Sequence, residues 1–118
     1  MGTFEVDIEV GDIHGMRFQR VRALVDTGST YLRIPRDVLQ AVGVVPQEQR
    51  PFKAADGRQI QYEIGQAQVR LVSRTLVNVV VFGEVGSAAL LGAVTLESFS
   101  LGVDPVGPRL VPVVALMM

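Results

Sequence analysis

The stretch Ala23-Leu24-Val25-Asp26-Thr27-Gly28-Ser29-Thr30 governs the interpretation of the whole chain, because an apolar strand runs directly into a carboxylate. A charge at the end of a buried strand is costly unless it is paired or protonated. Proteins tend to keep such groups where they function. We therefore take Asp26 as the candidate functional residue and expect the remaining residues to form the scaffold that holds it.

Length and composition restrict the class of protein. The chain has 118 residues, 48% of them hydrophobic, and a formal net charge of −1 at pH 7. A chain of this length typically forms one domain, which we place over residues 1–118. The hydrophobic content excludes a disordered chain. The near-zero net charge gives no general case for binding nucleic acid or an anionic membrane surface.

Cysteine usage and segment hydropathy restrict the compartment and the cofactors. The sequence has no cysteine, which excludes disulfides and thiolate metal sites, and a single histidine, His14, which supports neither a catalytic triad nor a metal cluster. The apolar run at residues 79–82, like every other apolar run of the sequence, is too short to cross a bilayer, and no signal peptide is recognisable. We expect no cofactor and a cytoplasmic location, either as a separate protein or as a domain of a longer chain.

Short alternations of apolar and polar residues predict an all-β class with two minor helices. The first expected strand covers residues 4–10. In the second, Met16 to Val25, the alternation changes phase near Gln19-Arg20, which predicts a β-bulge there. Further strands are expected at 31–34, 76–82, 101–103 and 110–116, and helices at 36–42 and 93–99.

A polar hairpin is expected between Phe52 and Ile64, because Asp56-Gly57 is a strong turn signal. Gly65 interrupts the alternation that follows the turn, and residues 67–71 resume it. Pro46 to Pro51 is expected to be a polar loop. The hairpin would therefore project from the strands that form the core.

The second half of the chain repeats the order of sequence features found around Asp26, but it has no acidic residue at the corresponding place. Leu90-Leu91-Gly92 precedes a short expected helix, as Asp26-Thr27-Gly28 precedes the helix at 36–42. The periodicity is weak. The second half contains neither Asp-Thr-Gly nor Asp-Ser-Gly, so each chain supplies one such Asp.

Leu24-Val25-Asp26-Thr27-Gly28-Ser29, the polar hairpin, and Leu90-Leu91-Gly92 before a helix together resemble the retropepsin-type aspartic proteases. The resemblance covers roughly residues 4–116. It implies a closed β-barrel with one or two short helices, a flap hairpin over a cleft, and an active homodimer. Thr30 and Ala93 stand where retroviral enzymes have an Asp and an Arg, so the chain is more similar to the cellular and bacterial relatives.

The same resemblance implies roles for individual residues. Asp26, Thr27 and Gly28 would be catalytic, with Thr27 bonding across the dimer axis. Ser29 stands where retroviral enzymes commonly have Ala, and its hydroxyl would donate to the carboxylate, as in the pepsin pattern. Substrate-binding positions would be Ser29, Thr30, Ala55, Asp56, Gly57, Arg58 and Leu91.

Elementary chemistry agrees with a dimer. Peptide hydrolysis by carboxylates needs two of them about 3 Å apart that share one proton, because two charges so close cannot both ionise. A symmetric pair of chains would supply two copies of Asp26. We therefore expect an aspartic endopeptidase, active as a homodimer on extended peptides, with residues 110–116 as a candidate dimer strand.

Other interpretations stay open at this stage. The same fold could serve as a catalytically silent dimerisation or peptide-binding module of a larger protein, although such a module gains nothing from a costly carboxylate pair. A monomer that becomes active only when pairing is driven is a third possibility. Asp26 could also be a turn-forming residue of an ordinary β domain, and Asp104-Pro105 reads as a turn rather than as a second acid.

Overall fold

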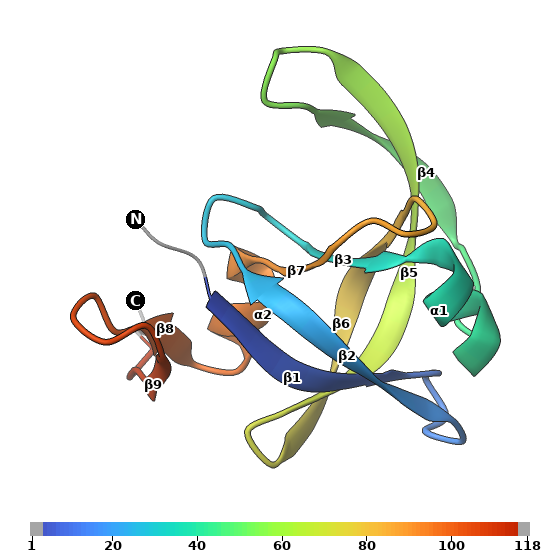
Figure 1. Cartoon of the computed structure of the whole chain (residues 1–118). Helices are drawn as coiled ribbons and strands as arrows, with labels where there is room; N and C mark the ends of the chain where they lie inside the picture. Colours follow the sequence, from blue (N-terminus) through green and yellow to red (C-terminus); the bar gives the residue numbers. More distant parts are fainter. Residues whose placement is uncertain (1–3, 116–118) are drawn as a thin grey trace.

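A computed structural model describes residues 4–115 of the chain and contains, over that range, nine strands and two short helices (Figure 1). In chain order these are β1 (Phe4–Gly11), β2 (Phe18–Val25), β3 (Leu32–Pro35), α1 (Arg36–Val42), β4 (Glu48–Lys53), β5 (Gln59–Leu71), β6 (Arg74–Gly83), β7 (Ala89–Leu91), α2 (Ala93–Ser98), β8 (Leu101–Val103) and β9 (Leu110–Pro112). Both helices and seven of the strands correspond to elements predicted from the sequence, and β7 falls on Leu90-Leu91, which was singled out only as an apolar segment. The remaining strand is β4, most of which lies in the segment expected to be a loop.

Six strands close into a barrel, as the predicted fold class requires. Their order around the barrel is β1-β2-β7-β3-β6-β5, and a second pairing of β5 with β1 completes the ring. The remaining strand of this sheet, β4, pairs only with β5 and extends the sheet beyond the barrel as a hairpin that rises above it (Figure 1). Closure removes the free sheet edges that an open sheet of this size would expose.

The barrel interior holds the hydrophobic core. The largest fully buried hydrophobic side chains come from five strands, from α1 and from the residue after α2, and are Ile8, Val10, Leu32, Ile34, Leu39, Val69, Val80, Phe82, Leu91 and Phe99. Along β3 the buried positions alternate with half-buried ones, which is the pattern of a strand with one face toward the core. The side chains that alternate with these core residues therefore point to the outer face of the barrel.

The bulge predicted at Gln19-Arg20 is wrong. β1 and β2 pair without interruption from Phe4↔Val25 to Gly11↔Phe18. The prediction assumed that Phe18 points into the core, whereas it lies on the outer face, where the guanidinium carbon of Arg70 sits 3.6 Å from its ring centre. A cation over an aromatic face can shield such a ring from water.

β5 is longer than the sequence predicted, because Gly65 does not end it. The strand continues for 13 residues through Gly65, pairing first with β4 and then with β1 and β6. A Cβ atom at Gly65 would lie 2.6 Å from the carbonyl oxygen of Val45. The glycine is thus needed for close backbone approach rather than for a break in the strand. Pairing with β5 also converts most of the expected loop at 46–51 into β4.

The two halves of the chain are interleaved. β2 pairs in parallel with β7, and β3 pairs in parallel with β6. Arg33 and Leu90 form the single antiparallel pair that joins β3 to β7. Each of the first-half strands β2 and β3 thus has a second-half strand beside it, and this exchange brings the segment after Asp26 against the segment after Leu91.

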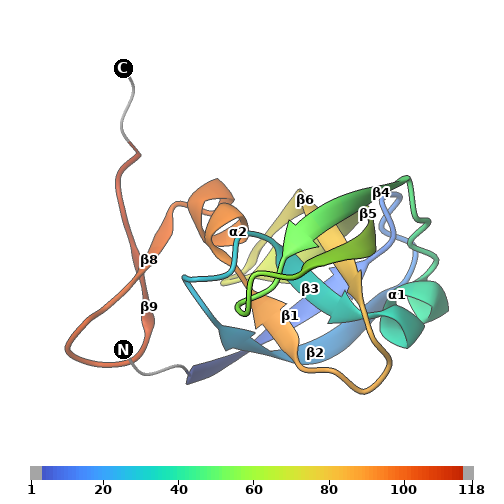
Figure 2. The same cartoon turned by 90° about the horizontal axis from the view of Figure 1, so that it is seen from above.

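The C-terminal hairpin of β8 and β9 stands apart from the barrel beside α2 (Figure 2). β9 ends at Pro112, earlier than the predicted strand at 110–116, and Leu116 lies outside the described residues. Val106 and Val114 are almost fully exposed on this part of the chain. Over residues 4–115, neither helix has the length and apolar character needed to cross a bilayer.

Candidate active site

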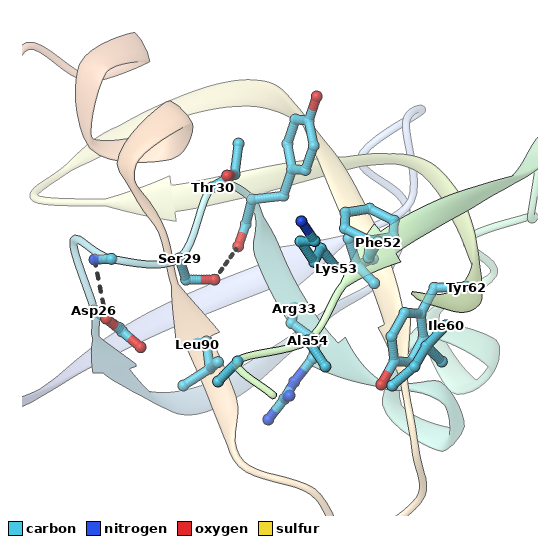
Figure 3. Close-up of a pocket in the computed structure, with 14 residues that line it drawn as sticks. Asp26, Ser29, Thr30, Arg33, Phe52, Lys53, Ala54, Ile60, Tyr62 and Leu90 are labelled. Carbon is cyan, nitrogen blue, oxygen red and sulfur yellow. Dashed lines mark hydrogen bonds between the residues drawn. The ribbon is translucent and has the colours of Figure 1, made fainter. Parts of the chain in front are cut away.

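Asp26 follows the last residue of β2, and three backbone hydrogen bonds fix its position. Its N–H donates to the carbonyl oxygen of Leu91 at 3.0 Å, which extends the pairing of β2 with β7. Its own carbonyl oxygen accepts from the N–H of Ser29 at 3.1 Å. The N–H of Gly28 donates to Oδ1 of the carboxylate at 3.0 Å (Figure 3).

The loop that carries Asp26 packs against the start of α2. The N–H groups of Ala93 and Val94 donate to the carbonyl oxygens of Ser29 and Thr30 at 2.8 and 2.9 Å. Gly92 permits this approach, because a Cβ atom there would lie 2.6 Å from the carbonyl oxygen of Tyr31 and 2.7 Å from that of Ser29. Gly92, in the second half of the chain, therefore permits the contacts that hold the Asp26 loop in place.

Asp26 lines a cleft of about 470 Å³ between the barrel and the β4–β5 hairpin (Figure 3). Its walls come from the Asp26 loop, from β3, from both strands of the hairpin and from the ends of β6 and β7. The lining residues are Asp26, Gly28, Ser29, Thr30, Tyr31, Arg33, Phe52, Lys53, Ala54, Ala55, Ile60, Tyr62, Val81 and Leu90. Clefts of this size commonly hold small ligands or peptide side chains.

Three aromatic rings form one wall of the cleft. Phe52 lies edge-to-face with Tyr31 and with Tyr62, at centroid distances of 6.0 and 5.8 Å. The Tyr62 hydroxyl donates to Oε1 of Glu84 at 3.2 Å. Partial burial, followed by this bond to an acid, raises the pKa of the Tyr62 hydroxyl. The wall is therefore apolar on its inner side and stays uncharged at neutral pH.

Five of the residues predicted for the site meet in this cleft: Asp26, Gly28, Ser29, Thr30 and Ala55. Thr27 is exposed beside them and is not part of the lining. Asp56, Gly57 and Arg58 also lie outside the lining. They form the hairpin tip, where Arg58 donates to both oxygens of Asp56 and Gly57 has a φ of 89°.

Leu91 lies on the other side of the sheet from the cleft. It is fully buried in the core, and its neighbour Leu90 lines the cleft instead. Successive side chains of a strand point to opposite faces, so an assignment that shifts by one residue selects the wrong face. Leu90, and not the predicted Leu91, is therefore the residue of β7 that lines the cleft.

The Ser29 hydroxyl is oriented differently from what the pepsin pattern implied. It donates to the carbonyl oxygen of Tyr31 at 3.5 Å, at the long limit of a hydrogen bond (Figure 3). The side-chain oxygen of Asp26 instead receives the N–H of Gly28. Within the described chain, a backbone donor thus takes the place expected for the Ser29 hydroxyl.

Sequence reasoning missed several lining residues, notably Arg33, Phe52, Lys53 and Tyr62. A signal for Arg33 was available, because Leu32 and Ile34 are apolar neighbours that alternate with it. A residue that lies between two core-facing residues of a strand must point to the opposite face of the sheet. For the hairpin residues no comparable signal existed, since their place depends on how β4 and β5 fold over the cleft. No cluster of acids and histidines suited to a metal occurs within residues 4–115.

Comparison with known proteins identifies related sequences and structures. Residues 11–98 match the sequence profile of the family described as "gag-polyprotein putative aspartyl protease". The matched segment runs from the end of β1 to the end of α2 and includes the Asp26 loop and the whole barrel apart from most of β1. No curated protein sequence matches the chain.

Solved structures share the fold at low sequence identity. A protease of EIAV in complex with an inhibitor aligns with a TM-score of 0.64 at 10% identity, covering 83% of this chain and 88% of its own. Simian foamy virus protease aligns at 0.58 and 17% identity, covering 81% and 94%. A retropepsin-like aspartic protease from Rickettsia conorii aligns at 0.55 and 18% identity, covering 87% and 88%. At these identities the likeness concerns the fold.

Proposed function

Because the chain belongs to the gag-type aspartyl protease family, we propose that it is an aspartic endopeptidase that works as a homodimer. The observation that carries the proposal is the placement of Asp26. Its carboxylate lines the cleft at the end of β2, held by the N–H of Gly28 and by the backbone bond to Leu91. A residue that served only as a turn former would not need a cleft in front of it.

The proposed mechanism uses one Asp26 from each of two chains. The ionised carboxylate takes a proton from a water molecule, and the oxygen of that water attacks the peptide carbonyl carbon. The protonated carboxyl group donates its proton to the carbonyl oxygen as the tetrahedral intermediate forms. As the intermediate collapses and the C–N bond breaks, the carboxyl group that took the proton of water gives it to the leaving nitrogen, and one hydroxyl of the intermediate returns a proton to the other carboxylate.

A homodimer is supported by the chemistry and by the shape of the chain. Asp26 is the one carboxylic acid that lines the cleft. The β8–β9 hairpin projects beside α2 and carries the exposed Val106, Val113 and Val114, an apolar surface that a second copy could cover (Figure 2). We propose that this hairpin contributes to the interface and that Thr27, exposed beside Asp26, faces the partner loop.

The substrate is proposed to be an extended peptide or protein segment bound between the barrel and the β4–β5 hairpin. The hairpin would act as a flap, with its tip at Ala55 to Arg58 moving over the bound peptide. The cleft has apolar and aromatic walls, which suit the side chains of an extended chain. We further propose that residues 1–118 act as one domain in the cytoplasm.

Substitution of Asp26 tests the proposal. Asp26→Asn keeps an oxygen for the N–H of Gly28 but cannot act as a general base, so we expect cleavage of a peptide library between pH 3 and pH 8 to fall by at least about 1,000-fold. Asp37→Asn, on the exposed face of α1, is the matched control and should cleave normally. Full activity of Asp26→Asn would overturn the assignment. Binding without turnover by the unmodified protein would favour a peptide-binding module instead.

A further inference from the structure

Arg33 is a cation whose side chain enters the cleft from β3. Leu32 and Ile34 on either side are fully buried in the core, so Arg33 points to the opposite face (Figure 3). Its Nη2 donates to the carbonyl oxygen of Ala88 at 2.9 Å. Its Cγ and Cδ lie so near Gly83 that a Cβ atom there would be 3.1 and 3.3 Å away. The side chain is therefore held in one place before any ligand binds.

Among the described residues, no carboxylate is in direct contact with the guanidinium of Arg33. Within residues 4–115 it forms no salt bridge, and its buried Nε has no hydrogen-bond partner. Glu84 accepts the hydroxyl of Tyr62 and makes no salt bridge to Arg33. An unpaired guanidinium in a partly buried site is costly, because neither water nor a carboxylate fully compensates its charge.

The cleft as a whole has an excess of positive charge. Lys53 also lines it and likewise forms no salt bridge within the described residues. Asp26 is the single acid in the lining, against the two cations Arg33 and Lys53. The net charge of the chain is −1, so this local excess is a property of the cleft and not of the protein surface in general.

We propose that Arg33 selects substrates that carry a carboxylate side chain, Glu or Asp, at the position of the peptide that lies over β3. This specificity rests on the proposed protease function and names the class of peptide that the same cleft accepts. A carboxylate matches the planar fork of an arginine with two parallel hydrogen bonds. A neutral side chain at this position would leave the guanidinium unpaired, which disfavours its binding.

Paired peptides test the specificity. A library of octapeptides incubated with the unmodified protein at pH 6 is first analysed by mass spectrometry for the residues that surround each cut. Glu and Gln versions of the best substrate are then compared, and the Glu peptide should have at least about a tenfold higher kcat/KM. Arg33→Met should abolish this ratio, whereas Arg20→Met, an exposed arginine of β2 outside the cleft, should keep it. An equal rate on both peptides, or an unchanged ratio in Arg33→Met, would overturn the proposal.

A binding assay separates this inference from the proposed activity. Fluorescence anisotropy with fluorescently labelled Glu and Gln versions of the library's peptides, at pH 7 on Asp26→Asn protein, needs no catalysis. A tenfold tighter Kd for Glu peptides, lost when Arg33→Met is added, would support the role of Arg33 even if no peptide were cleaved. Equal affinities for the two peptides would overturn it even if cleavage were observed. Circular dichroism establishes that each variant is folded.

Discussion

The N–H of Asp26 donates to the carbonyl oxygen of Leu91 at 3.0 Å, and this bond joins the ends of two strands that are 65 residues apart in the chain (26 to 91). It places the carboxylate beside the Leu90-Leu91-Gly92 segment. The proposed function depends on this junction, because the cleft is formed where the two segments meet. The stability of the junction should therefore be measurable separately from the chemistry of the acid.

Gly92→Ala should disturb the junction. The added Cβ atom would lie within 3 Å of the carbonyl oxygens of Ser29 and Tyr31, so the Asp26 loop must shift. We expect the free energy of unfolding in urea to fall by about 1–3 kcal/mol, the usual range for overpacking, and cleavage to fall with it. Gly107→Ala is the matched control, because no heavy atom lies within 4 Å of the new Cβ. Equal stability of the two variants would contradict the packing described.

Truncation of the two adjacent leucines of β7 should affect different properties, stability at Leu91 and substrate binding at Leu90. Leu91→Ala removes a fully buried side chain from the core and should lower the free energy of unfolding by about 2–5 kcal/mol. Leu90→Ala should cost about 1 kcal/mol or less, since that side chain is only half-buried, but should change KM because it lines the cleft. Urea denaturation and peptide kinetics on both variants check this. The reverse order would place the wrong leucine in the cleft.

Acid should destabilise the fold in part through Asp104. The N–H of Val106, followed by the side chain of Arg109, holds the pKa of Asp104 below its ordinary value of 3.8. Because the folded pKa is the lower one, the stabilisation is complete above the ordinary value and is lost as pH falls through the folded pKa. Asp104→Asn should therefore show a smaller drop in unfolding free energy between pH 6 and pH 2.5 than the unmodified protein. An identical drop would contradict the hydrogen bonds at this turn.

Val114→Asp should weaken the proposed homodimer. Val114 is 95% exposed beside the β8–β9 hairpin, and a charge buried in an interface there would be unpaired. We expect sedimentation over a dilution series to show a dimer Kd at least about tenfold higher. Val45→Asp, in the exposed loop between α1 and β4 on the other side of the barrel (Figure 2), is the control and should leave the Kd unchanged. A normal dimer in Val114→Asp would exclude this hairpin from the interface.

Local sequence patterns predicted most of the fold. Alternation located most of the strands, and the helix predicted at 36–42 coincides with α1, which Pro35 precedes and Gly43 follows at a φ of 86°. The errors at Phe18 and Gly65 have one cause. The environment of each is set by residues distant in sequence, Arg70 over the Phe18 ring and the carbonyl of Val45 against Gly65. A single-sequence pattern does not contain these contacts.

The site was predictable only where it coincides with a local motif. The stretch from Asp26 to Thr30 was found because its residues are consecutive, and all but Thr27 line the cleft. Phe52 and Tyr62 were missed because they reach the cleft through the curvature of the β4–β5 hairpin over the barrel (Figure 1). Leu91 was chosen over Leu90 because both are apolar, and the sequence alone did not indicate which face of β7 is buried.

The interleaving of the two halves has a consequence for the order in which the protein can mature. The loop around Asp26 is held by Leu91, Ala93 and Val94, which a ribosome adds more than sixty residues later. Until then β2 and β3 both lack β7, and β3 also lacks β6 until residue 83 has been added. Asp26 is thus synthesised long before the residues that form the cleft around it. Synthesis itself would delay the appearance of a competent site.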